Sequence, residues 1–219
     1  FDTGGNVITA NQNFLNVLGY QLGEITGKHH RTFVDPVDSG KPAYAQFWAD
    51  LNAGKASADV FKRVTKAGKD IYIQAVYSPI KDEVGRVVKI VKIATDITEQ
   101  RLASAHFEGQ IAAIDKAQAV IEFTLDGKII RANDNFLNTL GYVAAELTGA
   151  HHSLFVEQSY RQSPEYRMFW DKLGRGEYDA GQYKRIGKGG REIWIQASYN
   201  PINGLDGKPY KVVKYATDI

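Results

Sequence analysis

Hydrophobic residues follow two periods along this chain, one typical of strands and one typical of helices. Two short runs rich in Val and Ile, residues 119–124 and 128–132, flank an Asp126-Gly127 dipeptide. Because Gly accepts the positive φ that a tight turn needs, this pattern predicts a β-hairpin. A helix is expected next, since Asn133 is a good N-cap and apolar residues from Phe136 onward recur three and four positions apart.

Further patterns predict two more helices and three more strands. A short helix is expected around Ala144 to Glu146, closed by Gly149, followed by an irregular segment. Ser163-Pro164-Glu165 then offers a cap residue, a first-turn proline and an early acid, and aromatic residues continue at helical spacing to Gly174. Gly-containing turns separate the last three predicted strands, which are residues 178–186, 192–202 and 209–219. This order is typical of an α+β fold with an antiparallel sheet and helices on one side.

The whole pattern occurs twice. Asn133-Asp134-Asn135-Phe136-Leu137 corresponds to Asn11-Gln12-Asn13-Phe14-Leu15, which lies 122 positions earlier. The same offset relates Trp170 to Trp48, Pro201 to Pro79 and Asp218 to Asp96. A period of this length suits a whole domain better than one unit of a solenoid. The sequence therefore predicts two domains, residues 1–98 and 119–219, the first of them with a truncated N-terminal strand.

Residues 99–118 lie between the two copies and are rich in Ala, Glu, Gln and Lys, without proline. Apolar residues keep a helical spacing here, interrupted only by Gly109. We therefore expect a helical connector. The alternative is a loosely structured tether.

Composition narrows the functional classes. The net charge is +2, from 27 basic and 25 acidic residues, which gives no reason to expect a nucleic acid or an anionic membrane as partner. The absence of cysteine excludes disulfides, thiolate metal sites and a cysteine nucleophile, and it fits a cytoplasmic location. No motif of a hydrolase or phosphate-binding enzyme is present, so we do not expect an enzyme.

Several short motifs recur in both copies in the same order and resemble the PAS sensor domain. They are Asn-x-x-Phe, Gly-Tyr, Glu-x-x-Gly, the Gly-bearing hairpin before Ile-Trp-Ile-Gln-Ala (Ile-Tyr-Ile-Gln-Ala in the first copy), and the closing Asp-Ile, which Thr98 follows in the first copy. The His-His after the Gly and the Phe-Trp of the long helix are similar to the paired PAS domains of cytoplasmic bacterial methyl-accepting chemotaxis receptors.

This resemblance implies a sensory input module. Each domain would be a five-stranded antiparallel sheet that cups a small cavity beneath its helices. The segment Asp96-Ile97-Thr98 would pass a change to the helical connector. The resemblance also implies a small-molecule ligand, a homodimer through the PAS domains or flanking helices, and an output signalling domain in the full-length protein. The alternative is a ligand-free PAS pair that acts only as a dimerisation scaffold.

Strand alternation predicts which residues face the interior. In residues 193–199 the odd positions are apolar, so Ile195 and Ala197 should point inward, as should Ile73 and Ala75 of the first copy. Trp194 and Tyr72 then fall on the outer face, where an aromatic side chain needs a cover.

Basic residues are also expected inside. The resemblance places Arg63 and Arg185 where flavin-binding PAS domains touch their cofactor. Of the last-strand lysines, one in each copy must point inward, and the resemblance favours Lys92 and Lys214. A buried cation is costly without a partner, so an anion, water or an internal salt bridge, for example to Glu24 or Glu146, must accompany it.

The histidine pairs raise the question of a cofactor. Adjacent residues point apart, so His29-His30 alone would not chelate a metal ion. The resemblance leaves His30 and His152 open as haem axial ligands, against a capping or surface role. It also leaves FAD open, although Val34-Asp35-Pro36 departs from the Arg-His that precedes the proline in FAD-binding receptors. The candidate ligand-binding residues are His30, Phe33, Trp48, Arg63, Ile73, Ala75, Lys92, His152, Phe155, Trp170, Arg185, Ile195, Ala197 and Lys214.

Overall fold

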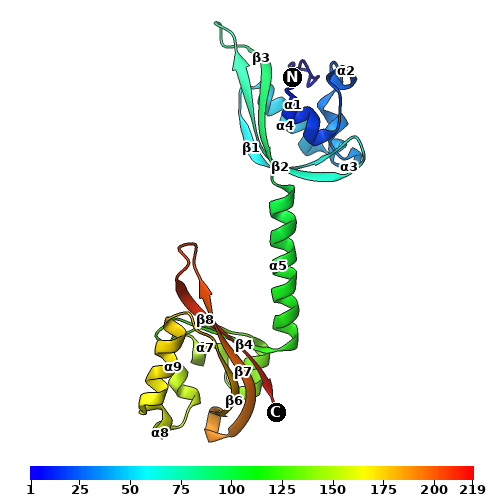
Figure 1. Ribbon diagram of the computed structural model, residues 1–219. Helices are drawn as coiled ribbons and strands as arrows, with labels where there is room; N and C mark the ends of the chain where they lie inside the picture. Colours follow the sequence, from blue (N-terminus) through cyan, green and yellow to red (C-terminus); the bar gives the residue numbers. More distant parts are fainter. The chain divides into compact units, whose positions relative to one another are not determined.

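The computed structural model describes residues 1–219, which divide into two compact units, Phe1–Phe107 and Glu108–Ile219. Figure 1 shows the same arrangement in each unit, with helices gathered on one side of an antiparallel sheet. Both units are therefore α+β, as the sequence predicts. We call them the first and second domains.

The second domain contains the complete sheet. Its strand order is β5-β4-β8-β7-β6, and every neighbouring pair is antiparallel. The strands are β4 (Ala119–Phe123), β5 (Ile129–Ala132), β6 (Asp179–Ile186), β7 (Glu192–Asn203) and β8 (Pro209–Asp218). Gly127 occupies the predicted hairpin turn with a φ of 82°. A Cβ atom there would lie 2.6 Å from His151 Nε2, so the turn needs glycine for space as well as for conformation.

The two longer helices of the second domain begin directly after the cap residues that the sequence predicts, Asn133 and Ser163. The helices of this domain are α6 (Asp134–Leu140), α7 (Ala144–Leu147), α8 (Gln158–Arg161) and α9 (Pro164–Gly174), with 3-10 turns at η2 (His152–Phe155) and η3 (Lys188–Gly190). Ser163 Oγ accepts a hydrogen bond from the Tyr166 amide at 3.2 Å and so caps α9. The segment expected to be irregular after Gly149 is in fact helical, because η2 and α8 fill it.

The first domain has a three-stranded sheet, which corrects the expectation of five strands in both copies. The strand order is β1-β2-β3, formed by β1 (Ser57–Val64), β2 (Asp70–Lys81) and β3 (Val87–Asp96). Of the residues that correspond to β4, only Phe1 is in this chain, and its amine and carbonyl both bond to Ile90 on β3. Without that neighbour, residues 7–10, which match β5, form no strand, while Asn6 makes the same isolated bridge to His29 that Lys128 makes to His151.

The rest of the first domain follows the second. Its helices are α1 (Gln12–Leu18), α2 (Leu22–Ile25), α3 (Pro36–Ser39) and α4 (Pro42–Asn52), with a 3-10 turn at η1 (His30–Phe33). Because β4 has no counterpart beyond Phe1, the outer edge of β3 is unpaired along much of its length. Val88, Val91 and Ile93 on this strand are exposed.

A single helix, α5 (Thr98–Ala117), occupies the region expected to be a helical connector. Phe107, Ile111 and Ile114 on this helix are all exposed. None of the helices has the length and hydrophobicity that crossing a membrane requires.

Candidate functional site

A buried tyrosine lies at the centre of each domain. In β7, Ile193, Ile195, Ala197 and Tyr199 are buried, whereas the intervening Trp194 is 51% exposed. The alternation therefore turns Tyr199 toward the helices, and its side chain has no solvent exposure. Tyr77 holds the same position on β2 and is equally buried.

His152 joins this tyrosine to the long helix. The side chain comes from η2 and is fully buried. Its Nε2 lies 3.0 Å from the Tyr199 hydroxyl and its Nδ1 lies 2.9 Å from the Tyr166 hydroxyl on α9. The first domain repeats the arrangement, with His30 placed 3.0 Å from the Tyr77 hydroxyl and 2.8 Å from the Tyr44 hydroxyl.

Arg185 approaches the same tyrosine from β6. Its Nη2 donates to the Tyr199 hydroxyl at 2.8 Å and its Nη1 donates to the Lys184 carbonyl at 2.7 Å. The guanidinium carbon lies 4.7 Å from the centre of the Tyr183 ring. The corresponding bonds of Arg63 are 2.9 Å to Tyr77 and 2.6 Å to Lys62. In both domains the arginine Nε is buried and has no hydrogen-bond partner.

These bonds fix a direction for the protons. The Tyr199 oxygen accepts from Arg185, so its own proton is free to be donated to His152 Nε2. The neutral imidazole then carries its proton on Nδ1 and donates it to Tyr166. In the chain from Arg185 through Tyr199 and His152 to Tyr166, each hydrogen bond therefore has one donor and one acceptor.

A lysine lies beside this chain without any hydrogen bond. Lys214 on β8 is fully buried, and its Nζ lies 4.9 Å from the centre of the Tyr199 ring and 5.5 Å from that of Phe136. In the first domain, Lys92 Nζ is also buried and unpartnered, 5.2 Å from the rings of Tyr77 and Phe14. We call the four residues Arg185, Tyr199, His152 and Lys214, and their first-domain equivalents Arg63, Tyr77, His30 and Lys92, the interior cluster.

Burial controls the protonation of the interior cluster. Desolvation lowers the pKa of Lys214 well below its ordinary value, and the nearby Arg185 lowers it further. The pKa of His152 is likewise lowered well below 6.5, first by burial and then by the charges of Arg185 and Lys214. Burial raises the pKa of Tyr199, which keeps its hydroxyl protonated. The cluster therefore favours neutral forms of His152 and Lys214.

The internal salt bridge considered for these cations is wrong. Glu146 pairs with Lys188 at 2.5 Å, and Glu24 pairs with Lys66 at 2.5 Å, both on the surface. No salt bridge involves Arg63, Lys92, Arg185 or Lys214. The buried positive groups are therefore stabilised only by hydroxyls, carbonyls and aromatic faces.

The paired histidines do not suit a haem or a metal ion. Both ring nitrogens of His152 and of His30 already bond to tyrosine hydroxyls, so neither has a free nitrogen to offer iron. The first histidine of each pair has the capping role instead, since His151 Nδ1 accepts from the Ser153 amide at 3.1 Å. The surface or capping role considered for His30 and His152 is thus also wrong. No group of three or more metal-ligating side chains exists.

The other predicted residues surround the interior cluster. Phe33 and Phe155 are fully buried beside the histidine, with ring centres 6.2 and 6.1 Å away. Trp48 and Trp170 contact the same imidazoles edge-on, and their Nε1 atoms are buried without a partner. Ile73, Ala75, Ile195 and Ala197 line the inner face of the sheet. Asp35, at the position that departs from FAD-binding receptors, caps α3 by accepting from the Val37 amide.

Sequence reasoning missed the tyrosines as site residues. Tyr44, Tyr77, Tyr166 and Tyr199 make most of the polar contacts of the cluster. One available signal was that all four belong to the identical positions of the repeat, where an apolar Phe would fill the same space. A hydroxyl retained at an inward position needs a partner.

An open cavity lies at the cluster of the first domain. The cavity has a volume of about 220 Å³ and is lined by Arg63, Lys92, Phe14 and Asn11 among others. In the second domain β4 lies beside β8 here, and the buried Ile121 pairs directly with Lys214. The cavity therefore reflects the missing counterpart of β4. The interior cluster, and not the cavity, is the feature that both domains share.

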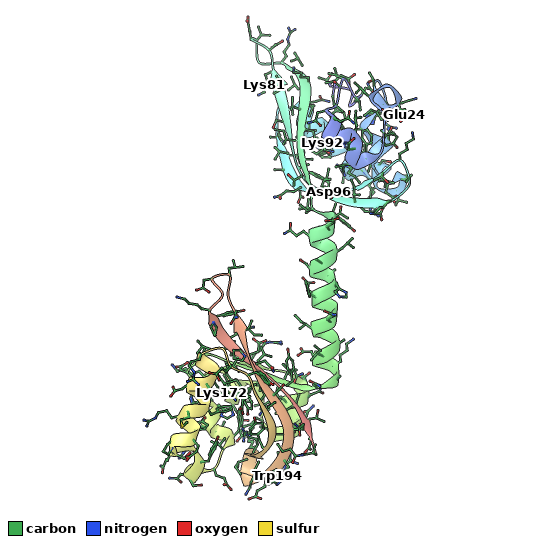
Figure 2. The ribbon with its side chains drawn as sticks, viewed as in Figure 1. Glu24, Lys81, Lys92, Asp96, Lys172 and Trp194 are labelled. Atoms are coloured by element: carbon green, nitrogen blue, oxygen red, sulfur yellow. The ribbon has the colours of Figure 1, made fainter.

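The last strand of the first domain leads straight into α5. Asp96 Oδ1 accepts hydrogen bonds from the Thr98 amide at 2.9 Å and from the Thr98 hydroxyl at 2.5 Å. The Tyr72 amide on β2 donates to Thr98 Oγ1 at 2.9 Å, and Arg101 lies 4.8 Å over the Tyr72 ring. Figure 2 labels Asp96 at this junction. The start of α5 is therefore bonded to the sheet that carries Lys92.

The outer-face aromatics are covered differently in the two domains. Arg101 covers Tyr72, as expected of a flanking helix. Trp194 is 51% exposed and points away from the helices (Figure 2), so the cover expected for it is not found.

Comparisons with known proteins agree with this architecture. A model of the PAS fold matches residues 7–94 and 129–216. The biofilm dispersion protein BdlA of Pseudomonas aeruginosa is 43% identical over 219 residues, which are 100% of this chain and 52% of BdlA. The aerotaxis receptor of Escherichia coli is 29% identical over 103 residues, 47% of this chain and 20% of the receptor. The chain thus spans about half the length of BdlA and less of the receptor.

A solved structure is similar to about half of this chain. The PAS domain of a protein from Colwellia psychrerythraea is 18% identical, with a TM-score of 0.46, and the match covers 52% of this chain and 96% of that one.

Proposed function

The chain belongs to the PAS-fold family, with one copy at residues 7–94 and a second at 129–216, and on that premise we propose that it is a sensory input module of a bacterial signalling protein. A small ligand, or a change in redox state or oxygen, would act at the interior cluster. Asp96-Ile97-Thr98 and α5 would then relay the change. Similarity to a biofilm dispersion protein and to an aerotaxis receptor supports a chemoreceptor-like role.

One observation carries the proposal. Lys214 Nζ and Arg185 Nε are both buried within the second domain and neither has a hydrogen-bond partner. A buried basic group without a counter-charge costs several kcal/mol if it stays charged and costs the free energy of deprotonation if it does not, so a fold that only needed a core would be more stable with apolar residues here. The same pair of unpartnered groups recurs as Lys92 and Arg63. We propose that these groups are retained because they interact with what the domain senses.

We also propose partners and a location for this module. The proposal includes a homodimer formed through the PAS domains or their flanking helices, an output signalling domain in the longer protein, and a cytoplasmic location. Catalytic turnover by these two domains is not part of it.

The second candidate function is a ligand-free scaffold that dimerises and positions an output domain. The observation that favours it is the complete burial of His152, Phe155 and Tyr199, which fill the second domain with protein atoms. A scaffold needs no sensing site, and its interior cluster would then only set the packing.

The two functions are separated by analysing the purified 219-residue protein. An absorbance scan detects a flavin or haem band, and mass spectrometry of the denatured protein detects a released colourless metabolite. Sensing predicts a stoichiometric molecule that is lost when Lys92 and Lys214 are both changed to Met. The exposed Lys208→Met variant is the matched control and should retain it. A colourless protein that releases nothing contradicts sensing and supports the scaffold.

A further inference from the structure

The C-terminal end of α5 lacks the usual means of termination. The last carbonyls of a helix have no partner within it, and many helices satisfy them by ending in a glycine with positive φ. No glycine occurs between Gly109 and Gly127, and no other residue type has a positive φ. The chain passes from Ala117 through Gln118 directly into β4. The end of α5 must therefore find its hydrogen-bond donors elsewhere.

Two asparagines at the start of α6 supply them. Asn133 Nδ2 lies 2.9 Å from the Asp115 carbonyl and 2.8 Å from the Gln118 carbonyl. Asn135 Nδ2 lies 3.3, 3.1 and 3.1 Å from the carbonyls of Asp115, Lys116 and Gln118. The negative end of the α5 dipole thus meets the positive end of α6, which adds to the attraction.

Asn133 also ties this contact to the fold. Its Oδ1 accepts from the Phe136 amide at 3.0 Å and from the Val120 amide at 2.9 Å. One side chain therefore touches the end of α5, the start of β4 and the first turn of α6. A movement of the end of α5 therefore acts on the start of β4 and on the first turn of α6.

The next residue along α6 reaches the interior cluster. Phe136 follows Asn135 directly, is buried, and presents its ring 5.5 Å from Lys214 Nζ. The same ring packs edge-on against Phe155 at 5.3 Å. The path from α5 to the cluster is therefore short, because Asn135 contacts the helix end and its neighbour contacts Lys214.

The first domain shows that Asn135 is not needed for the helix it sits in. Asn11 and Asn13 hold the same positions at the start of α1, and Asn11 Oδ1 caps the Phe14 amide at 3.0 Å. Neither side-chain amide nitrogen donates a hydrogen bond, and Asn13 is exposed. The bonds of Asn135 exist only where a helix end is docked.

We infer that Asn133 and Asn135 form the joint through which α5 sets the position of α6, and with it the contact between Phe136 and Lys214. These two asparagines are positioning residues for the interior cluster of the second domain. The inference rests on the proposed sensory function, because it names how the connecting helix would act on the second sensing site.

The test compares one substitution at two equivalent positions of the 219-residue protein, Asn135→Ala and the control Asn13→Ala. Hydrogen exchange of the Gln118 amide, which bonds to the Ile114 carbonyl at 2.9 Å, reports on the end of α5. The ¹⁵N chemical shifts of the His152 ring report on the interior cluster. Loss of three helix-end hydrogen bonds should speed the exchange at least about fivefold. The His152 signals should shift in the same variant, and Asn13→Ala should change neither.

Each other outcome overturns the inference. Faster exchange with unchanged His152 signals means that the pair merely caps α5, and no change in either means that the contacts do not hold the helix. If Asn135→Ala fails to fold, Asn135→Asp gives the second measurement, since a carboxylate facing three carbonyls should loosen the end of α5 at least as much. Both readouts are made without a ligand, so a protein that releases no metabolite would refute sensing while the coupling could still be measured.

Discussion

Lys214 and Tyr199 face each other across β7 and β8, with the Lys214 Nζ atom 4.9 Å from the centre of the tyrosine ring. A desolvated cation over an aromatic face is stabilised by about 2 kcal/mol. The cost of burying an ammonium ion is several kcal/mol, so this contact alone does not compensate for it. The consequences of that imbalance can be measured.

Replacing Lys214 with Met should stabilise the second domain. An apolar side chain of similar length removes a buried amine that must otherwise lose its proton or keep its charge without a counter-charge, and the free energy of unfolding should rise by about 1–3 kcal/mol. Urea unfolding monitored by tryptophan fluorescence measures this change. Exposed Lys208→Met serves as control and should stay within about 0.5 kcal/mol of the parent. A clear loss of stability in Lys214→Met would show instead that the lysine meets a counter-charge in solution.

Replacing Tyr199 with Phe should destabilise the second domain. The hydroxyl accepts from Arg185 and bonds to His152, so its loss leaves two buried groups without a partner. The free energy of unfolding should fall by about 2–4 kcal/mol, from one or two unsatisfied groups. Tyr178→Phe removes a hydroxyl from an exposed side chain and should change little. A loss below about 0.5 kcal/mol for Tyr199→Phe would mean that the hydrogen-bonded chain contributes nothing to stability.

The stability of the second domain should fall as the pH drops below the ordinary histidine pKa of 6.5. The pKa of His152 is lowered well below that value in the folded state, so the unfolded state takes up its proton first. The loss is absent above pH 6.5 and grows by about 1.4 kcal/mol for each pH unit until the lowered pKa is reached. Unfolding measured across this range in His152→Gln should show a smaller slope. His106→Gln, on the exposed face of α5, should keep the parental slope, and equal slopes in all three proteins would disprove the assignment.

Replacing Thr98 with Val should loosen the start of α5. The hydroxyl accepts from the Tyr72 amide and donates to Asp96, so Val leaves the sheet and the helix with one fewer link. Exchange of the amides in the first turn of α5 should speed up about tenfold, which corresponds to about 1.4 kcal/mol. Thr95→Val, one position before Asp96 and exposed, is the matched control. Unchanged exchange in Thr98→Val would show that Thr98 does not hold the start of α5 to the sheet.

Most of the fold could be predicted from the sequence because local signals agree with one another. Asn133 caps α6, Gly127 turns the first hairpin, and the alternation of residues 193–199 separates the buried Ile195 from the exposed Trp194. The sheet of the first domain has three strands because Phe1 is the only residue of this chain that corresponds to β4, in line with the truncated N-terminal strand that the repeat predicts. Strand number depends on neighbours that a local pattern does not contain.

The sequence predicted many of the residues that lie in the candidate site, but not which of them form hydrogen bonds with each other. Parity placed one of Lys211 and Lys214 inside, the resemblance favoured Lys214, and the structure buries it. An anion, water or a carboxylate such as Glu146 was considered as the partner of Arg185. The partner is instead the hydroxyl of Tyr199, and Glu146 is held at the surface by Lys188. Which polar groups meet in a core depends on side-chain packing across β6, β7 and η2, and periodicity carries no information about it.

The unpaired edge of β3 has a practical consequence for work with these 219 residues. Free amides and carbonyls along an exposed, partly apolar strand invite a copy of the same strand to align beside it. Self-association at high concentration should therefore begin at Val88, Val91 and Ile93, since β8 of the second domain is enclosed between β4 and β7. A charged residue in place of Ile93 should prevent this strand pairing and keep concentrated samples dispersed.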